Sequence, residues 1–228
     1  MSKHTEEHTE PIVDVQEVYS KTEHFIDKNK KRLSIVVLAI IVVVGGYIGY
    51  KKLIIAPQEL EAQSAMFMAE KYFAQDSLQL AINGDGEHYG FIDIVDIYSG
   101  TKAANLSHYY LGIAYRNTGD YEMAIDELKS FSSDDIMISA VALGAIGDCY
   151  MELDDLEQAI SYYEKAAGKN ENGLTSPIFL FKAGMAYEDL QDFAAAGEKY
   201  KAIKNNYPDS RESQTIDKYI ARVEALIQ

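Results

Sequence analysis

The chain has 228 residues, 47% of them hydrophobic and 25% charged, and its formal net charge is −15 at pH 7. Residues 57–228 carry most of the acid, with 13 Lys and Arg against 29 Asp and Glu, a net charge of −16. Such a surface repels nucleic acid and anionic lipid, which argues against both as partners. Cys149 is the only cysteine, so no internal disulfide can form.

The first 32 residues form a tail with two parts. Residues 1–11 are polar and acidic, a composition typical of disorder. After Asp14, apolar residues recur at helical spacing, which predicts a short amphipathic helix leading into a membrane. These residues are Val15, Val18, Tyr19, Phe25 and Ile26.

Residues 33–56 are predicted to be a transmembrane anchor. Leu33 to Tyr50 contain no charge, and 18 helical residues rise roughly 27 Å, close to the thickness of the hydrocarbon core. A cleaved signal peptide is the competing interpretation. The 32 residues before the apolar run and the lack of a prompt small-x-small cleavage site favour an uncleaved anchor.

Flanking cations predict the orientation of this anchor. Five precede the span and two follow it, which favours a cytoplasmic N-terminus and places residues 57–228 on the far side. The five are Lys21, Lys28, Lys30, Lys31 and Arg32, and the two are Lys51 and Lys52. Within the span, Gly45 and Gly49 form a G-x-x-x-G, the spacing that lets two helices make close contact in lipid.

Residues 57–101 are predicted to form a degenerate first hairpin. Gln58 to Ala81 are expected to be one long helix, and residues 83–86 (NGDG) are a strong turn signal. The apolar run from Phe91 to Ile97 is expected to be the second helix, and Thr101 to cap the helix that follows.

The rest of the chain repeats one skeleton three times. A glycine is followed by a tyrosine after three residues, an aspartate after eight, an alanine after twelve and a large residue after sixteen. The copies are Gly112-Tyr115-Asp120-Ala124-Leu128, Gly147-Tyr150-Asp155-Ala159-Tyr163 and Gly184-Tyr187-Asp192-Ala196-Tyr200. A fixed period in this range is the signature of stacked helical hairpins, predicted at about 105–138, 140–173 and 177–210.

Each skeleton position has a predicted physical role. The glycine lets a neighbouring helix approach, the aspartate caps the second helix, and the alanine lies where the two helices cross. Pro208 stops the last helix of the third copy. A final amphipathic helix at 213–228 is expected to cover the exposed apolar face of that copy.

Residues 105–210 resemble the tetratricopeptide repeat, whose pattern places Leu-Gly, Tyr, Ala and a terminal Pro at matching offsets. The chain departs from the family in having no tryptophan, because His108, Leu143 and Leu180 occupy that place. The resemblance implies an all-α fold, with one N-terminal transmembrane helix followed by a tetratricopeptide-repeat α-solenoid and a C-terminal capping helix.

No catalytic motif is present in the sequence. G-x-S-x-G, a phosphate loop, H-E-x-x-H and C-x-x-C are all absent, and the histidines are scattered. The sequence therefore predicts a protein that is not an enzyme and that needs no cofactor or metal.

In tetratricopeptide proteins the first helix of each hairpin lines a concave face, and this resemblance implies a protein-binding groove. Its aromatic, methionine and carboxylate groups suit an amphipathic or unfolded segment, because flexible methionine adapts to varied apolar surfaces. The alternative is that several of these residues, Ile113 and Met185 above all, only pack the fold. The groove residues are Tyr109, Ile113, Arg116, Asn117, Asp148, Met151, Glu152, Phe181, Met185, Glu188 and Asp189.

The tail sequence HFIDKNKKRL, one span and degenerate repeats beyond it together resemble the YfgM-type ancillary subunit of the bacterial Sec translocon. This resemblance implies a bacterial inner-membrane protein with a periplasmic repeat domain. Its partners would be Sec translocon subunits, a periplasmic chaperone and exported clients. Two alternatives stay open: a scaffold that assembles one membrane or envelope complex, and a receptor of reversed topology that faces the cytosol.

Overall fold

The computed structural model describes residues 15–227, and the predicted disorder of residues 1–11 lies outside them. Helices and their connections make up this part of the chain, which contains no β-strand. The helices are α1 (Val15–Tyr50), the π-helical turn η1 (Lys51–Ile55), α2 (Ala56–Ala74), α3 (Leu78–Asn83), α4 (Phe91–Ile97), α5 (Lys102–Thr118), α6 (Tyr121–Ser130), α7 (Ile136–Glu152), α8 (Leu156–Gly168), α9 (Thr175–Asp189), α10 (Phe193–Asn206), the 3₁₀ turn η2 (Ser213–Thr215) and α11 (Ile216–Leu226). The structure divides between Ile54 and Ile55 into two units.

The first unit contains α1. The predicted amphipathic segment and the apolar run lie in this one helix of 36 residues, without a break between them. The apolar side chains from Ile35 to Val44 are exposed. In the part of the chain that the structure describes, one helical stretch, near the N-terminus, is long and apolar enough to cross a membrane by length and composition.

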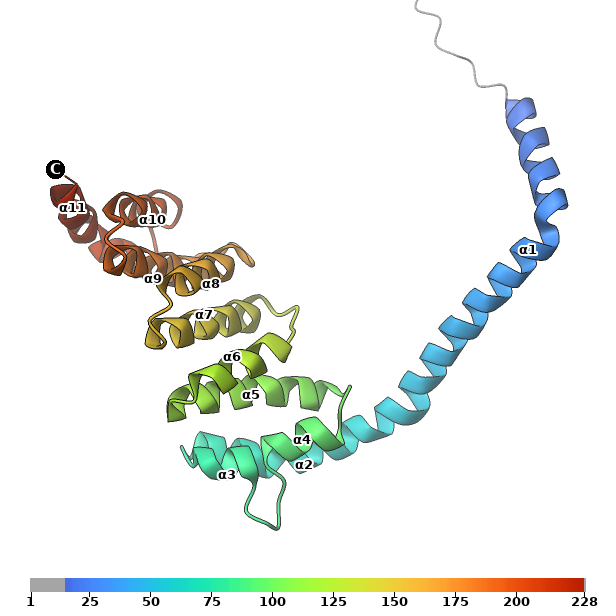
Figure 1. The fold of residues 1–228 in the computed structure, drawn as a ribbon, viewed down its shortest axis with the longest axis horizontal. Helices are drawn as coiled ribbons and strands as arrows, with labels where there is room; N and C mark the ends of the chain where they lie inside the picture. The colour runs from blue at the N-terminus through green and yellow to red at the C-terminus, as the bar shows by residue number, and fades with distance from the viewer. Residues whose placement is uncertain (1–14, 228) are drawn as a thin grey trace, which may run out of the picture. The chain divides into compact units, whose positions relative to one another are not determined.

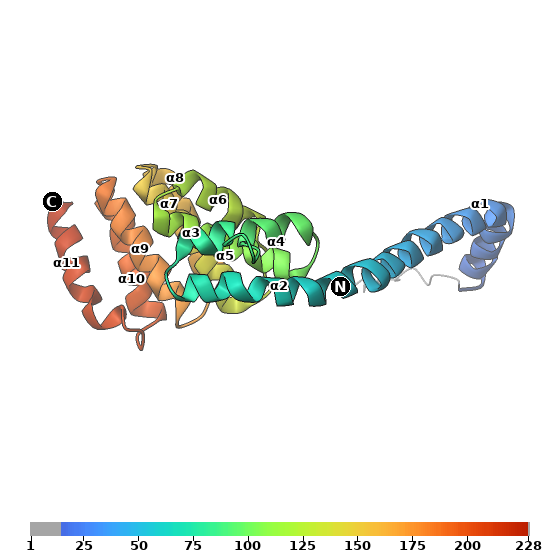
Figure 2. The same ribbon diagram turned by 90° about the horizontal axis from the view of Figure 1, so that it is seen from below.

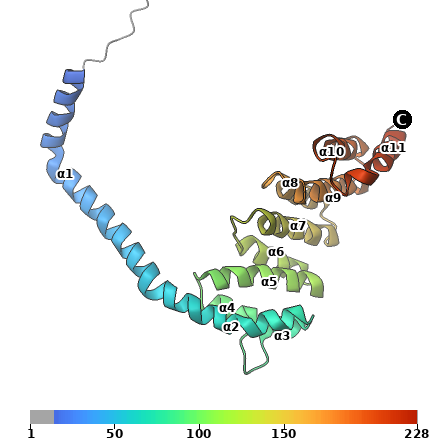
Figure 3. The ribbon, with the colours of Figure 1, turned by 180° about the vertical axis from the view of Figure 1, so that it is seen from behind.

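The second unit is a solenoid of helical hairpins (Figure 1). Each helix packs against its neighbours in the chain, and the first helices α2, α5, α7 and α9 also pack against one another in a row. Figures 2 and 3 show the same succession of helices from two further directions. The three predicted hairpins are α5–α6, α7–α8 and α9–α10, which confirms the all-α solenoid.

The repeated glycines mark a close approach of the two helices within each hairpin. A Cβ atom built on each glycine would lie within 3 Å of the large residue sixteen positions later, closer than carbon atoms approach without bonding. These distances are 2.9 Å from Gly112 to Leu128 Cδ2, 2.7 Å from Gly147 to Tyr163 Cδ1 and 2.8 Å from Gly184 to Tyr200 Cζ. The alanines at the helix crossings, Ala124, Ala159 and Ala196, are all 0% exposed.

The aspartates at the start of the second helices do not all act as predicted. The carboxylates of Asp155 and Asp192 accept backbone N–H groups of the following helix, at 3.1 and 3.0 Å. The prediction that Asp120 caps α6 in this way is wrong, because its carboxylate accepts the Thr118 hydroxyl at 2.7 Å instead. The other copies have leucine at the position of Thr118, so no hydroxyl competes there.

The prediction of one long helix from Gln58 to Ala81 is also wrong. The chain turns after α2 at Asp76, whose φ is +58°, and α3 begins after Ser77. The amide of Ser77 donates to the Tyr72 carbonyl at 2.9 Å, the same bond that the three aspartates make to their tyrosines. Ala69, Tyr72, Ser77 and Ala81 thus repeat the offsets of three, eight and twelve residues. The first hairpin is α2–α3, and α4 is an additional short helix.

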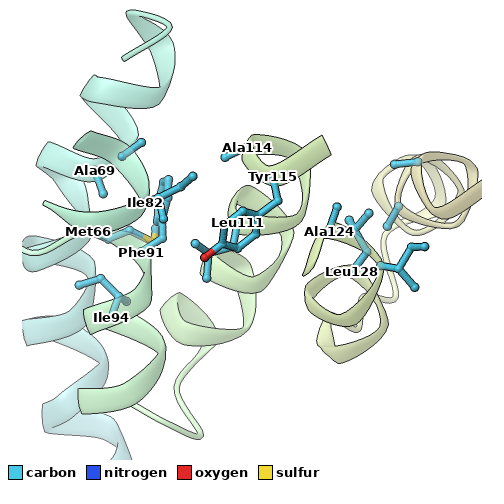
Figure 4. Packing of buried hydrophobic residues seen from close by; sticks show 14 of the residues in the cluster. Met66, Ala69, Ile82, Phe91, Ile94, Leu111, Ala114, Tyr115, Ala124 and Leu128 are labelled. Carbon is cyan, nitrogen blue, oxygen red and sulfur yellow. The ribbon is translucent and has the colours of Figure 1, made fainter. Parts of the chain in front are cut away.

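Buried side chains of α2, α3 and α4 join the first hairpin to α5 (Figure 4). The ring of Phe91 on α4 stacks on Tyr110 of α5, with ring centres 4.9 Å apart. As predicted, the Thr101 hydroxyl caps α5 by accepting the Ala104 amide at 3.0 Å. At the other end of the solenoid α11 packs on α10, and its Val223 is 0% exposed.

Candidate protein-binding surface

A hollow of about 450 Å³ opens among the first helices of the three repeats, and we call it the central hollow. It contains six of the eleven residues predicted for the groove, contributed by α5, α7 and α9. Its lining is Arg116, Tyr121, Asp148, Met151, Glu152, Tyr163, Lys182, Met185 and Asp189.

Asp148 is the electrostatic centre of this hollow. Its Oδ1 lies 2.6 Å from Lys182 Nζ on α9 and accepts the Tyr163 hydroxyl at 2.8 Å. Its Oδ2 lies 3.3 Å from Arg116 Nη1 on α5. One carboxylate therefore connects side chains of all three repeats. Burial of the phenol, reinforced by the charge of Asp148, raises the pKa of Tyr163 and keeps this donor protonated.

Methionines supply the apolar part of the hollow. Met185 on α9 is 46% exposed, and Met151 on α7 is half-buried. Of the two residues for which packing was the main alternative, Ile113 is half-buried against the core and Met185 is exposed. A flexible thioether at such a position presents an adaptable apolar surface.

The other residues predicted for the groove lie outside the hollow. On α5, Tyr109 packs against Phe131 with ring centres 5.3 Å apart, and Asn117 is exposed beside Arg116, whose guanidinium donates to its amide oxygen. Ile113 packs against the core of the first repeats.

Phe181 and Glu188 on α9 contact the capping helix. The ring of Phe181 meets Tyr219 of α11 edge-on, with centres 4.8 Å apart. Glu188 accepts a hydrogen bond from Tyr200 at 2.5 Å and one from Arg222 of α11 at 2.7 Å. These contacts fasten α11 to the end of the solenoid. Because α11 covers both side chains, they are not part of the open surface.

Sequence reasoning missed Tyr121, Tyr163 and Lys182. Tyr121 begins a second helix, and only first helices were considered. Tyr163 is the large skeleton residue of its repeat, and its ring is buried while its hydroxyl reaches Asp148. Lys182 lies two residues before Gly184, outside the positions that the resemblance assigned to the groove.

The glycines of α1 have room for a partner. A Cβ atom on Gly45 or Gly49 would meet nothing within 4 Å. Contact of these glycines with another helix stays a prediction.

Groups that support metal or thiol chemistry are not assembled in residues 15–227. No cluster of three or more His, Cys, Asp or Glu side chains that could hold a metal ion occurs among them. Cys149 is fully buried, and burial raises the pKa of its thiol to about 11, which disfavours the reactive thiolate.

Comparison with known proteins identifies the repeats. Residues 107–134 and 179–210 match one tetratricopeptide repeat model, and residues 140–170 match another. These segments are tetratricopeptide repeats. The first hairpin, α2–α3, lies outside the matched residues. No curated protein sequence matches the chain.

A similar solved structure supports the same fold. It is the crystal structure of a protein from Podosopora anserina, described as a kinesin light chain with nearly identical TPR-like repeats. The TM-score is 0.53, the sequences are 14% identical, and the match covers 73% of this chain and 86% of that one. This likeness concerns the fold alone, and the tetratricopeptide repeats indicate a protein–protein interaction module.

Proposed function

We propose that this protein is a membrane-anchored interaction module that assists newly exported proteins as a translocon-associated co-chaperone. The apolar part of α1 would hold it in a bacterial inner membrane, with the repeats in the periplasm. The observation that carries the proposal is the central hollow, where methionines and charged groups of three repeats converge on one surface.

The chemistry of the hollow supports polypeptide clients. Met151 and Met185 adapt to apolar side chains of different shapes, as a binder of many unfolded segments requires. The charged groups around them can pair with polar parts of the same segments. A repeat domain tethered by one anchor meets such segments as they leave the membrane.

A second candidate is a scaffold for one membrane or envelope complex. The observation that favours it is the fixed position of Asp148, which is held by Arg116, Lys182 and Tyr163. A hollow organised in this way suits one partner of defined shape better than many.

A photo-crosslinking residue at Met185 separates the two candidates. Met123 on α6 is the matched control, since it is 49% exposed and lies outside the hollow, against 46% for Met185. Many exported proteins crosslinked at Met185 but not at Met123 support the co-chaperone, and one sharp adduct supports the scaffold. Equal crosslinking at both positions contradicts a binding role for the hollow.

Two further measurements test the location and the partners. Lys169→Cys adds an exposed thiol to a chain whose own Cys149 is buried. We expect a membrane-impermeant thiol reagent to label it in cells with a permeabilised outer membrane, and no labelling would overturn the orientation. Translocon or chaperone subunits should copurify from gently solubilised membranes, and their absence would refute the translocon association.

A further inference from the structure

The central hollow contains more carboxylates than cations. Arg116 and Lys182 both pair with Asp148, which leaves Glu152 and Asp189 as additional negative charges at the exposed rim. Within the described residues neither rim carboxylate forms an ion pair. Glu152 accepts one long hydrogen bond, from Tyr121 at 3.4 Å.

The two cations are poorly placed to recruit a carboxylate from a ligand. Lys182 Nζ is 2.6 Å from Asp148 Oδ1, so an incoming anion would have to lie beside the charge of Asp148. Asp148 is also fixed by the Tyr163 hydroxyl, which opposes its displacement. Like charges at such short range repel, and the net charge of −16 on residues 57–228 adds to the effect.

A cation in the ligand is attracted by the negative charge that repels an anion. It can pair with Glu152 and Asp189 without breaking any ion pair of the protein. On α7, Met151 immediately precedes Glu152. On α9, Met185 lies four residues before Asp189, about one helical turn away. An apolar side chain of the ligand can therefore contact the methionines while its cationic neighbour reaches the rim.

We propose that the central hollow binds a segment of a partner polypeptide in which a large apolar side chain stands next to Lys or Arg. This inference rests on the proposed protein-binding function and names the chemistry of the segment. The charge complementarity of the rim selects the cation, and the two thioethers select the apolar group.

Binding of three labelled peptides to the full chain in nanodiscs of zwitterionic lipid tests the inference. The peptides share a leucine pair and differ only at the two following positions, which are Lys, Gln or Glu. Fluorescence anisotropy should rank affinity as Lys above Gln above Glu. The preference for Lys over Gln should shrink between about 50 mM and about 500 mM salt. Empty nanodiscs measure binding to lipid.

Neutralising the rim should remove the preference for the cation. The Glu152→Gln/Asp189→Asn double variant should bind the Lys peptide roughly fivefold more weakly and the Gln peptide unchanged. The matched control is Glu122→Gln/Asp126→Asn, the same change of charge at two exposed residues of α6. It should bind both peptides within about twofold of the wild type.

The outcomes separate this inference from the function beneath it. Equal binding of the Lys and Gln peptides, tighter binding of the Glu peptide, or equal weakening by both double variants overturns the cationic segment. If no peptide binds although the crosslinker at Met185 yields specific adducts, the cationic segment is wrong and protein binding stands. A crosslinker at Met185 without specific adducts overturns the function itself.

Discussion

Substituting Gly147 by alanine tests the close approach on which each hairpin depends. The new methyl group would lie 2.7 Å from Tyr163 Cδ1 and Cε1 and 3.3 Å from the Ala159 carbonyl. Tyr163 cannot easily withdraw, because it is 4% exposed and its hydroxyl is bonded to Asp148 at 2.8 Å. Overpacking of this kind costs about 2–3 kcal/mol at such a fixed site. Alanine regains about 1 kcal/mol through its helix propensity.

The net cost is therefore about 1–2 kcal/mol, which corresponds to a roughly 5- to 30-fold larger population of the open form of the second repeat. Hydrogen exchange followed by mass spectrometry reads this as faster exchange of the amides in α7 and α8. A local readout is needed because a solenoid need not unfold as a single cooperative unit.

Gly168→Ala is the matched control, in the same repeat. Gly168 is the last residue of α8, and a Cβ there would meet nothing within 4 Å. Alanine at this position should leave exchange unchanged or slow it by up to roughly fivefold. If Gly147→Ala also leaves exchange within about twofold of the wild type, the ring moves aside at little cost and our reasoning is wrong.

Three further predictions concern the turns and the cap. Asp154→Gly should stabilise the chain by about 0.5–1 kcal/mol, because φ at this residue is +60°, and a lower melting temperature would contradict this. The carboxylate of Asp85 accepts hydrogen bonds from the Tyr72 hydroxyl and from backbone amides. These bonds hold the pKa of this carboxyl well below its usual range. The stability that this carboxylate gives to the folded state is complete above its pKa in the unfolded chain, about 4, and is lost as the pH falls below that value. Asp85→Asn should thus melt at a lower temperature than the wild type at neutral pH, and the two melting temperatures should converge below about pH 4. If the difference between them does not change with pH, the charge of Asp85 is not its cause. Glu188→Gln should speed hydrogen exchange in α11 about two- to fivefold by weakening the bond from Arg222, and unchanged exchange would show that this bond does not hold the cap.

The three later hairpins were predictable because their determinants are local in sequence. The approach of two antiparallel helices demands a glycine and a large residue sixteen positions apart, as at Gly112 and Leu128. A demand of this kind recurs at fixed spacing in every repeat, so it can be recognised without knowledge of the rest of the fold.

A first hairpin was predicted, but its helices were assigned wrongly because other residues fill the skeleton positions. Ala69 takes the place of the glycine, and Ser77 that of the aspartate. Without a glycine or an aspartate at these two positions, the helical pattern of α2 was read as continuing to Ala81. The hydrogen bond from the Ser77 amide to the Tyr72 carbonyl shows that the same turn forms with other residue types at the skeleton positions.

The binding surface was harder to predict than the fold because burial depends on distant parts of the chain. Nothing near Phe181 or Glu188 in the sequence indicates that α11 contacts both, through Tyr219 and through Arg222, which is 34 residues from Glu188. Met185, only four residues from Phe181, lies outside that contact and stays 46% exposed.

Two tyrosines at one skeleton position explain where the hollow ends. Tyr163 and Tyr200 are both the large residue of their repeat, and each hydroxyl donates to a carboxylate on the first helix of the same hairpin. The acceptor of Tyr163 is Asp148, whose further partners are cations of the flanking repeats. The acceptor of Tyr200 is Glu188, whose further partner is Arg222 of the capping helix. The same buried donor therefore organises an open charged hollow where another repeat follows, and a closed end where α11 takes the place of that repeat.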